Sequence, residues 1–217
     1  MFCHESPDSE SYQPSPITRS AISKNWEKFT KWRDVTVISN LCRLINADGD
    51  TITIKTDVSY KDVVGLRWPR PKQPKKLQFQ VVTAMGIVYT SDGFLVMIPR
   101  DSGDWPPSIE CPGGFIRAEY LEDGKINVQD FIRTRVAEDL DIDRSLITDC
   151  DYLHVYDAKE IMEYMLLYKV KIAMSKAEIK SHNPDFVLLP RHYRPEAHCT
   201  NCISLIHAPT RGALLTL

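Results

Sequence analysis

Residues 110–142 constrain the fold more than any other part of the sequence, because they contain the pattern of an amphipathic helix. Val128, Ile132, Val136 and Leu140 recur every four residues, which predicts a single apolar stripe that faces a core. Asn127 precedes the stripe as the expected N-cap, since its side chain can accept a hydrogen bond from the first helical turn. The segment therefore predicts a helix packed against a hydrophobic core.

A polar cluster is expected on the opposite face of this helix. Arg135, Glu138 and Asp139 are three and four residues apart, so their side chains are neighbours. Upstream, residues 112–114 read Pro-Gly-Gly, which predicts a tight turn. One interpretation is a solvated face with an ordinary arginine–carboxylate pair. The other is a metal or phosphate site, because Mg²⁺ prefers oxygen ligands and often binds a few carboxylates together with phosphate oxygens.

This layout resembles the Nudix box, G-x5-E-x7-R-E-U-x-E-E-x-G-U, in which U is a bulky aliphatic residue. Glu138 and Asp139 correspond to its Glu-Glu pair, and Ile142 corresponds to its final aliphatic position. Asp141 replaces the last glycine, and Asp is among the few other residues that tolerate a left-handed backbone. Arg135 stands where the family has the first glutamate of R-E-U.

The upstream glutamate of the box has no match at the family's spacing. Its position falls on Ile126 when counted from the helix and on Tyr120 when counted from Gly114, so the loop is longer than the pattern. Glu119 or Glu122 could supply a carboxylate from this insertion, and the spacing does not choose between them.

The resemblance implies a Nudix-like α/β/α sandwich and a metal-dependent hydrolase of a nucleoside-diphosphate-linked substrate. Glu138 and Asp139 would be the catalytic residues, and together with the carbonyl group of Gly113 they would hold Mg²⁺ or Mn²⁺. Gly113 and Gly114 would shape the loop around the substrate phosphates. Arg135 would bind phosphate, as arginine forks do, rather than act as a base.

Two further residues are candidates for substrate binding. Trp105 could stack on a base and Arg100 could contact a phosphate, with packing and solvated charge as the alternatives. The mismatch at Arg135 leaves a second function open, a catalytically degenerate Nudix-fold module that binds a nucleotide or a protein partner. A third is a reaction other than hydrolysis on a diphosphate-bearing metabolite.

Composition bounds the partners and the location. The formal net charge of -2 and the pI near 6.3 give no overall attraction to nucleic acid or to an anionic membrane. The first residues lack a basic region followed by an apolar run, and no stretch reaches the roughly 18 apolar residues of a spanning helix. We therefore expect a cytoplasmic protein with a small-molecule, nucleotide-like partner and no membrane partner.

The chain divides into three expected segments. Residues 1–24 are rich in Ser, Pro, Asp and Glu, which predicts a flexible tail. Residues 25–76 form a β-rich extension, with a short helix at 25–32, strands at 35–40, 41–47 and 51–56, and a Pro-rich connector at 68–76. This extension could support a homodimer, bind substrate or be purely structural. Residues 77–217 form the Nudix-like domain.

Strands flank the predicted helix on both sides, as an α/β/α sandwich requires. Apolar and alternating runs predict them at 79–90, 94–98, 152–156, 164–174 and 186–189. Asp157, Glu160 and Glu163 could add a carboxylate after the box, with a solvated turn as the alternative. Cys199 and Cys202 form a C-x-x-C pair that lacks a second ligand pair at zinc-site spacing, so two reduced thiols near a turn are favoured.

Overall fold

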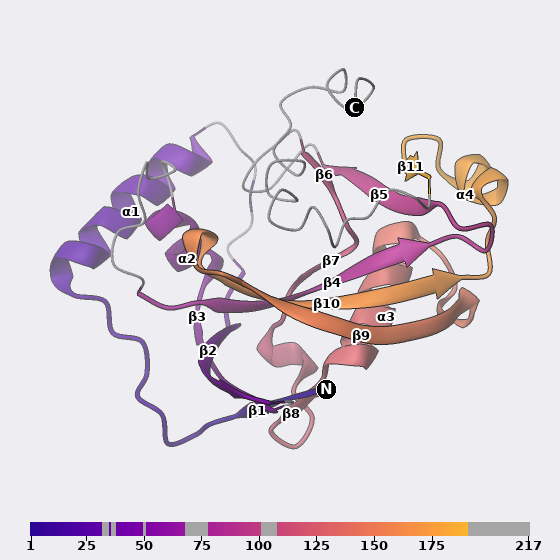
Figure 1. Ribbon diagram of the computed structural model, residues 1–217. Helices are drawn as coiled ribbons and strands as arrows, with labels where there is room; N and C mark the ends of the chain where they lie inside the picture. Colours follow the sequence, from indigo (N-terminus) through magenta and orange to yellow (C-terminus); the bar gives the residue numbers. More distant parts are fainter. Residues whose placement is uncertain (32–34, 36–37, 50, 68–77, 101–107, 191–217) are drawn as a thin grey trace. The chain divides into compact units, whose positions relative to one another are not determined.

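A computed structural model describes all residues except 32–34, 36–37, 50, 68–77, 101–107 and 191–217 (Figure 1). Trp105, the Pro-rich connector and the Cys199–Cys202 pair lie outside the described residues. The described part is a mixed α/β structure with four α-helices and eleven β-strands, which agrees with the prediction of an α/β fold. Within it, no helix is both long and apolar enough to cross a membrane.

The chain forms two compact units, and neither is a continuous segment. The first unit contains Met1–Ala84, Phe115–Phe131 and Val155–Leu166. The second contains Met85–Gly114, Ile132–His154 and Leu167–Leu217. The unit boundaries therefore do not coincide with the segment boundaries expected after residues 24 and 76.

The first unit carries most of the N-terminal elements. They are β1 (Phe2–Glu5), α1 (Pro16–Thr30), β2 (Leu41–Asp48), β3 (Thr51–Val58), α2 (Tyr60–Arg67), η1 (Ala118–Tyr120), β8 (Lys125–Asn127) and η3 (Lys159–Ile161). β2 and β3 form an antiparallel hairpin that turns at Gly49 with a φ of 55°, as the Asp48-Gly49 sequence predicts. β1 lies between β3, which it pairs in parallel, and β8, which it pairs in antiparallel orientation.

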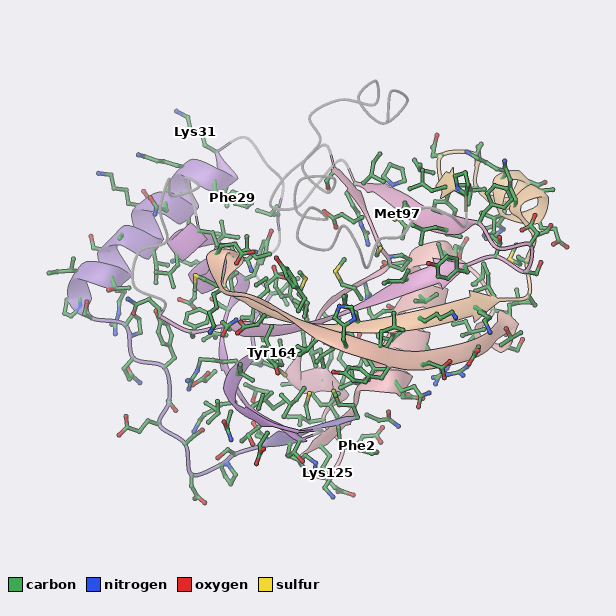
Figure 2. The ribbon with its side chains drawn as sticks, viewed as in Figure 1. Phe2, Phe29, Lys31, Met97, Lys125 and Tyr164 are labelled. Carbon is green, nitrogen blue, oxygen red and sulfur yellow. The ribbon has the colours of Figure 1, made fainter. Side chains whose placement is uncertain are left out.

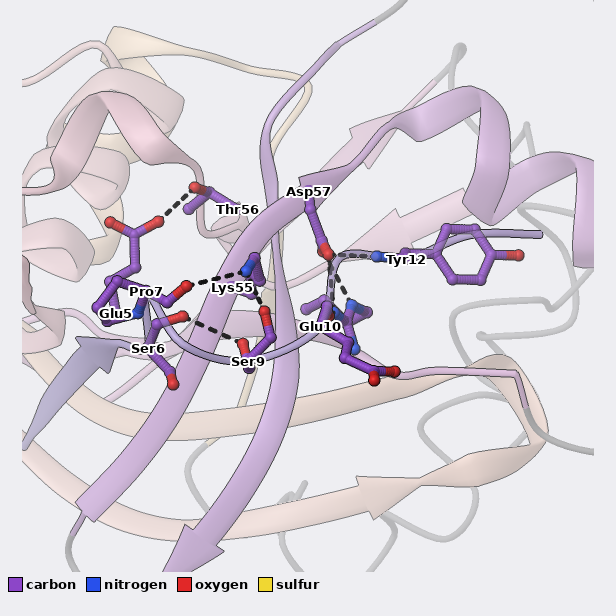
Figure 3. A network of polar contacts seen from close by, with 10 residues as sticks. Glu5, Ser6, Pro7, Ser9, Glu10, Tyr12, Lys55, Thr56 and Asp57 are labelled. Atoms are coloured by element: carbon purple, nitrogen blue, oxygen red, sulfur yellow. Dashed lines mark hydrogen bonds and ion pairs between the residues drawn. The ribbon is translucent and has the colours of Figure 1, made fainter.

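The N-terminal segment differs from the expected flexible tail. Cys3 of β1 is fully buried, and α1 begins within the tail because Ser15 accepts a hydrogen bond from the Thr18 N–H group, with Pro16 at the first turn. The connection between them crosses β2 and β3 (Figure 3), where Asp57 accepts from the Tyr12 N–H group at 2.6 Å. The composition of residues 1–24 did not reveal this ordered structure, because the residues that contact it lie far along the chain.

The core of the first unit is built around aromatic side chains. Phe29 of α1, labelled in Figure 2, stacks on Trp26 with ring centroids 5.7 Å apart, so this face of α1 packs inward. Tyr60 and Val63 of α2 join the same buried cluster. The helix itself begins earlier than expected, and α2 was not predicted at all. Of the strand expected at 35–40, the described residues 35 and 38–40 belong to no strand.

The second unit carries β5 (Leu95–Arg100), β6 (Ser108–Glu110), η2 (Arg144–Leu146), α4 (Lys176–His182) and β11 (Val187–Leu189). β5 pairs with β6 on one side and with β11 on the other, both in antiparallel orientation. Five elements contribute residues to both units: β4 (Val81–Tyr89), β7 (Gly113–Phe115), α3 (Val128–Leu140), β9 (Ile147–Ala158) and β10 (Glu163–Ile172). The predicted strands at 79–90, 94–98, 152–156, 164–174 and 186–189 thus correspond to β4, β5, β9, β10 and β11.

Candidate functional site

Helix α3 forms as its sequence predicts. The Asp130 N–H group donates to the side-chain oxygen of Asn127 at 3.2 Å, which makes Asn127 the N-cap. Val128, Ile132, Val136 and Leu140 are completely buried, so the apolar stripe packs as expected. Burial of the apolar stripe therefore places the charged residues on the opposite face of α3.

The helix ends in a left-handed cap. Asp141 has a φ of 52°, a left-handed conformation, and it stands at the position where the Nudix box has a glycine. The Ile142 N–H group donates to the Ala137 carbonyl at 3.0 Å, and the Asp141 N–H group donates to the Glu138 carbonyl at 3.2 Å. These two bonds form a Schellman motif, which closes the helix directly after the acidic pair.

The expected Pro-Gly-Gly turn is instead the start of a strand. Gly113 and Gly114 belong to β7 with φ values of 142° and 152°, which favour glycine. The Pro112 carbonyl accepts a backbone hydrogen bond from the Gly86 N–H group of β4 at 2.8 Å. The turn prediction was wrong because strand pairing over a long sequence distance overrides the local preference of two adjacent glycines.

Asp139 is the centre of the site. Its side chain is only 6% exposed, and its Oδ2 atom accepts from the Gly113 N–H group at 2.9 Å. Arg100 Nη2, at the end of β5, lies 3.1 Å from the same oxygen. Arg135 Nη2 lies 3.1 Å from Oδ1. One buried carboxylate therefore joins α3, β5 and β7.

Arg135 contacts both members of the acidic pair. Its Nη1 atom lies 2.6 Å from Glu138 Oε2, while its Nη2 atom reaches Asp139. The Glu138 side chain is 52% exposed, and that of Arg135 is 24% exposed. Asp139 thus faces inward and Glu138 outward, with one guanidinium group spanning them.

A third carboxylate, not predicted from the sequence, completes this charged network. Glu110 Oε2 lies 3.9 Å from Arg100 Nε, and Glu110 Oε1 accepts from the hydroxyl group of the buried Ser108 at 2.7 Å. The i, i+2 spacing of Ser108 and Glu110 on a strand could have placed them on one face. The network contains three carboxylates and two guanidinium groups, so it carries one net negative charge.

A resident metal ion does not fit this arrangement. Both oxygens of Asp139 already accept hydrogen bonds, and two of the donors are cations that repel a metal. Among the described residues, no three His, Cys, Asp or Glu side chains come close enough together to hold a metal ion. The expected set of Glu138, Asp139 and the Gly113 carbonyl is therefore not assembled as a metal centre.

The other candidate carboxylates belong to the first unit and have partners of their own. Glu119 pairs with Arg117, and Glu122 exchanges two backbone hydrogen bonds with Lys125. Glu163 is in a salt bridge of 2.7 Å with Arg67. Asp157 Oδ1 accepts from Gln80 at 2.6 Å, and Glu160 Oε1 accepts from the Tyr156 hydroxyl group at 3.2 Å. The carboxylates of Glu119, Glu163, Asp157 and Glu160 thus each have a local contact, whereas the contacts of Glu122 are made by its backbone.

No protein-family model matches the sequence. No curated protein matches it either. The solved structures similar to this chain include DR0079 from Deinococcus radiodurans, with 14% identity and a TM-score of 0.37 over 57% of this chain and 72% of that chain. Another comes from a study of MutT from Aliivibrio salmonicida and Vibrio cholerae, with 14% identity and a TM-score of 0.30 over 58% of this chain and 98% of that chain. Likenesses this weak establish neither the family nor the activity of this chain.

Proposed function

We propose that this chain is a Nudix-like α/β/α protein with an N-terminal extension, and that it hydrolyses a nucleoside-diphosphate-linked substrate. The observation that carries the proposal is the contact between the glycine strand and the acidic helix. Gly113 donates to Asp139 at 2.9 Å although 26 residues separate them. This contact brings together the two parts of the sequence that resemble the Nudix box.

The residues of the second unit supply defined contacts for a diphosphate. Arg100 and Arg135 are 31% and 24% exposed, so phosphate oxygens can reach both guanidinium groups. A Cβ atom added at Gly114 would meet no heavy atom of the described residues within 4 Å, so these residues leave room beside β7. Glu138 is the exposed acid of the pair. Trp105 remains a candidate for stacking on the base, outside the described residues.

A turnover screen tests this proposal directly. Purified protein would be incubated with a panel of nucleoside-diphosphate compounds, in parallel with Mg²⁺, with Mn²⁺ and with a chelator. Release of a nucleoside monophosphate that stops with chelator and in Glu138→Gln supports the hydrolase and identifies the substrate class. Glu138 is half-exposed, so this substitution should leave the fold intact. No release from folded protein across the panel would refute hydrolysis.

A second candidate function is supported by the two arginines on Asp139. A Nudix-fold module that has lost hydrolysis would bind a nucleotide without turnover, and guanidinium groups on the acidic pair suit such a module. Calorimetry run beside the turnover screen separates the two functions. Nucleotide binding that is unaffected by chelator, with no turnover, would favour the binding module.

A further inference from the structure

Helix α1 of the first unit has one face buried against α2 and the opposite face exposed. Ile22 and Phe29 are each only 2% exposed. Gly65 of α2 lies so close to α1 that an added Cβ atom would be 2.7 Å from Ile22 Cγ2, and the Gly65 carbonyl accepts from Asn25 Nδ2 at 2.8 Å. This tight contact fixes which side of α1 faces away from the core.

An exposed ridge runs along that outer side of α1. Successive helical residues are rotated by about 100°, so positions spaced by three and four residues share one side. Lys31 follows the last residue of α1 with helical dihedral angles, a φ of -55° and a ψ of -28°, so it continues the same line (Figure 2). The α1 ridge consists of five exposed residues: Ile17, Ala21, Lys24, Lys28 and Lys31.

The two ends of the α1 ridge differ in chemistry. Ile17, in the first turn, is 83% exposed, which makes it the most exposed large apolar side chain among the described residues, ahead of Phe2 at 48%. The three lysines occupy the other end and extend for about 10 Å at 1.5 Å per residue. The ridge therefore presents an apolar end and a basic end along one line of about 21 Å.

The charge of the chain is unevenly distributed, and α1 carries the positive part. Residues 16–31 contain four cations and a single anion, Glu27, which gives them a net charge of +3. The whole chain has a net charge of -2, so the remaining residues carry -5. Salt screens charges that are more than about 10 Å apart at 0.1 M ionic strength, so a nearby anionic surface responds mainly to the local charge.

An anionic lipid surface matches both ends of the α1 ridge. Its head groups attract lysines, and the acyl layer below them accepts an apolar side chain. The phosphate backbone of a nucleic acid would satisfy the lysines, but it offers no apolar layer to Ile17. We propose that the α1 ridge docks this protein reversibly on an anionic membrane surface, with the three lysines at the head groups and Ile17 inserted beneath them. This inference does not depend on the proposed hydrolysis.

Vesicle flotation of the full chain tests the docking. The probes are vesicles of phosphatidylcholine alone and vesicles in which about one-third of the lipid is phosphatidylserine. Wild-type protein should float with the anionic vesicles and not with the neutral ones. Binding should be lost at 1 M salt, where the screening length falls to about 3 Å. No binding to anionic vesicles, or equal binding to both kinds, would overturn the proposal.

Two triple variants assign the binding to the α1 ridge. Each lysine near an anionic surface strengthens binding by about fivefold, so replacing Lys24, Lys28 and Lys31 by Gln should weaken it roughly 100-fold. The matched control removes the same charge from three exposed lysines elsewhere, by replacing Lys125, Lys159 and Lys171 with Gln. The control should bind nearly as well as wild type. Equal weakening in the two variants would show that only the net charge matters, and the ridge would be rejected.

Ile17→Ser separates a membrane from a nucleic acid as the partner. The side chain is 83% exposed, so the substitution should leave the fold intact. Vesicle binding should weaken about tenfold, because the inserted apolar side chain is lost. Binding to single-stranded polyuridylic acid, measured in parallel, should be weak in wild type and in the variant. If wild type bound the RNA more tightly than the vesicles, or if Ile17→Ser floated as wild type does, the α1 ridge would not be a membrane-docking surface.

Discussion

Replacing Asp139 by Asn tests whether this carboxylate joins α3 to β5 and β7. Three donors converge on it, the Gly113 N–H group at 2.9 Å and one nitrogen each of Arg100 and Arg135 at 3.1 Å. An amide has one acceptor oxygen, so the NH₂ group of Asn must face at least one of these donors. The substitution keeps the size of the side chain and removes its charge, which isolates the polar contribution.

The expected loss can be worked from burial. A buried donor left without a partner costs about 1–3 kcal/mol. Arg100 and Arg135 are 31% and 24% exposed, so solvent screening limits each lost ion pair to about 0–1 kcal/mol. The free energy of unfolding should therefore fall by about 1–5 kcal/mol. In a chain of this size, that loss lowers Tm by about 2–20 °C.

Urea denaturation followed by circular dichroism measures this loss, and thermal melting checks it. The matched control is Glu138→Gln, which removes the other acid of the pair. Its side chain is 52% exposed and contacts Arg135 only at the surface, so the expected loss is below about 1 kcal/mol. Equal losses for the two variants would show that Asp139 does not hold the three elements together, and the reasoning would be refuted.

Three further predictions concern stability. Gly86→Ala should lower the free energy of unfolding by about 1–3 kcal/mol, because the added Cβ atom would lie 2.9 Å from Val136 Cγ2. An unchanged midpoint in urea denaturation would contradict this packing. Asp141→Gly should raise stability by up to about 1 kcal/mol, since its φ of 52° is strained for an L-residue, and a lower Tm would contradict the left-handed cap. Burial raises the pKa of Asp57, but hydrogen bonds and the Arg43 guanidinium outweigh it and hold the pKa below its usual value. The pairing therefore stabilises the fold above the unfolded pKa of about 3.9, and this stabilisation is lost as the pH falls through the folded pKa. Below about pH 4, the urea midpoint of Asp57→Asn should therefore change less with pH than the midpoint of the wild type.

The sequence predicted those elements whose signal is local. The four-residue recurrence from Val128 to Leu140 is a complete helix signal, and the Arg135 contacts with the acidic pair follow from helical spacing alone. Similarly, Asp48-Gly49 predicted its hairpin because the turn chemistry is contained in two residues. These contacts span few residues, so they need no knowledge of the rest of the fold.

Elements that depend on distant partners were missed. β1 is held by pairing with β3 and β8, and nothing in the Ser- and Pro-rich composition around it reports those partners. Arg100 lies 3.1 Å from Asp139, 39 residues further along the chain, and the sequence did not indicate this contact, while its contact with phosphate stays a prediction. The strand that contains Gly113 and Gly114 was missed for the same reason. Register and pairing between strands are set by tertiary packing, which a single sequence does not contain.

We predict that the charge at position 135 determines whether α3 can bind a cation by itself, and Arg135→Glu tests this prediction. The variant would place three carboxylates on one helix face, because Glu138 and Asp139 are three and four residues away. Repulsion should lower stability by about 0.2–0.5 kcal/mol for each new like-charge pair. Mn²⁺ should reverse this loss, since saturation at about 100 times Kd adds about 2.7 kcal/mol, or about 5–10 °C in Tm. Arg144→Glu makes the same charge change at an exposed site and should gain nothing from Mn²⁺. If Mn²⁺ stabilised the wild type and the Arg135→Glu variant equally, Arg135 would not be the group that excludes a free cation from Asp139.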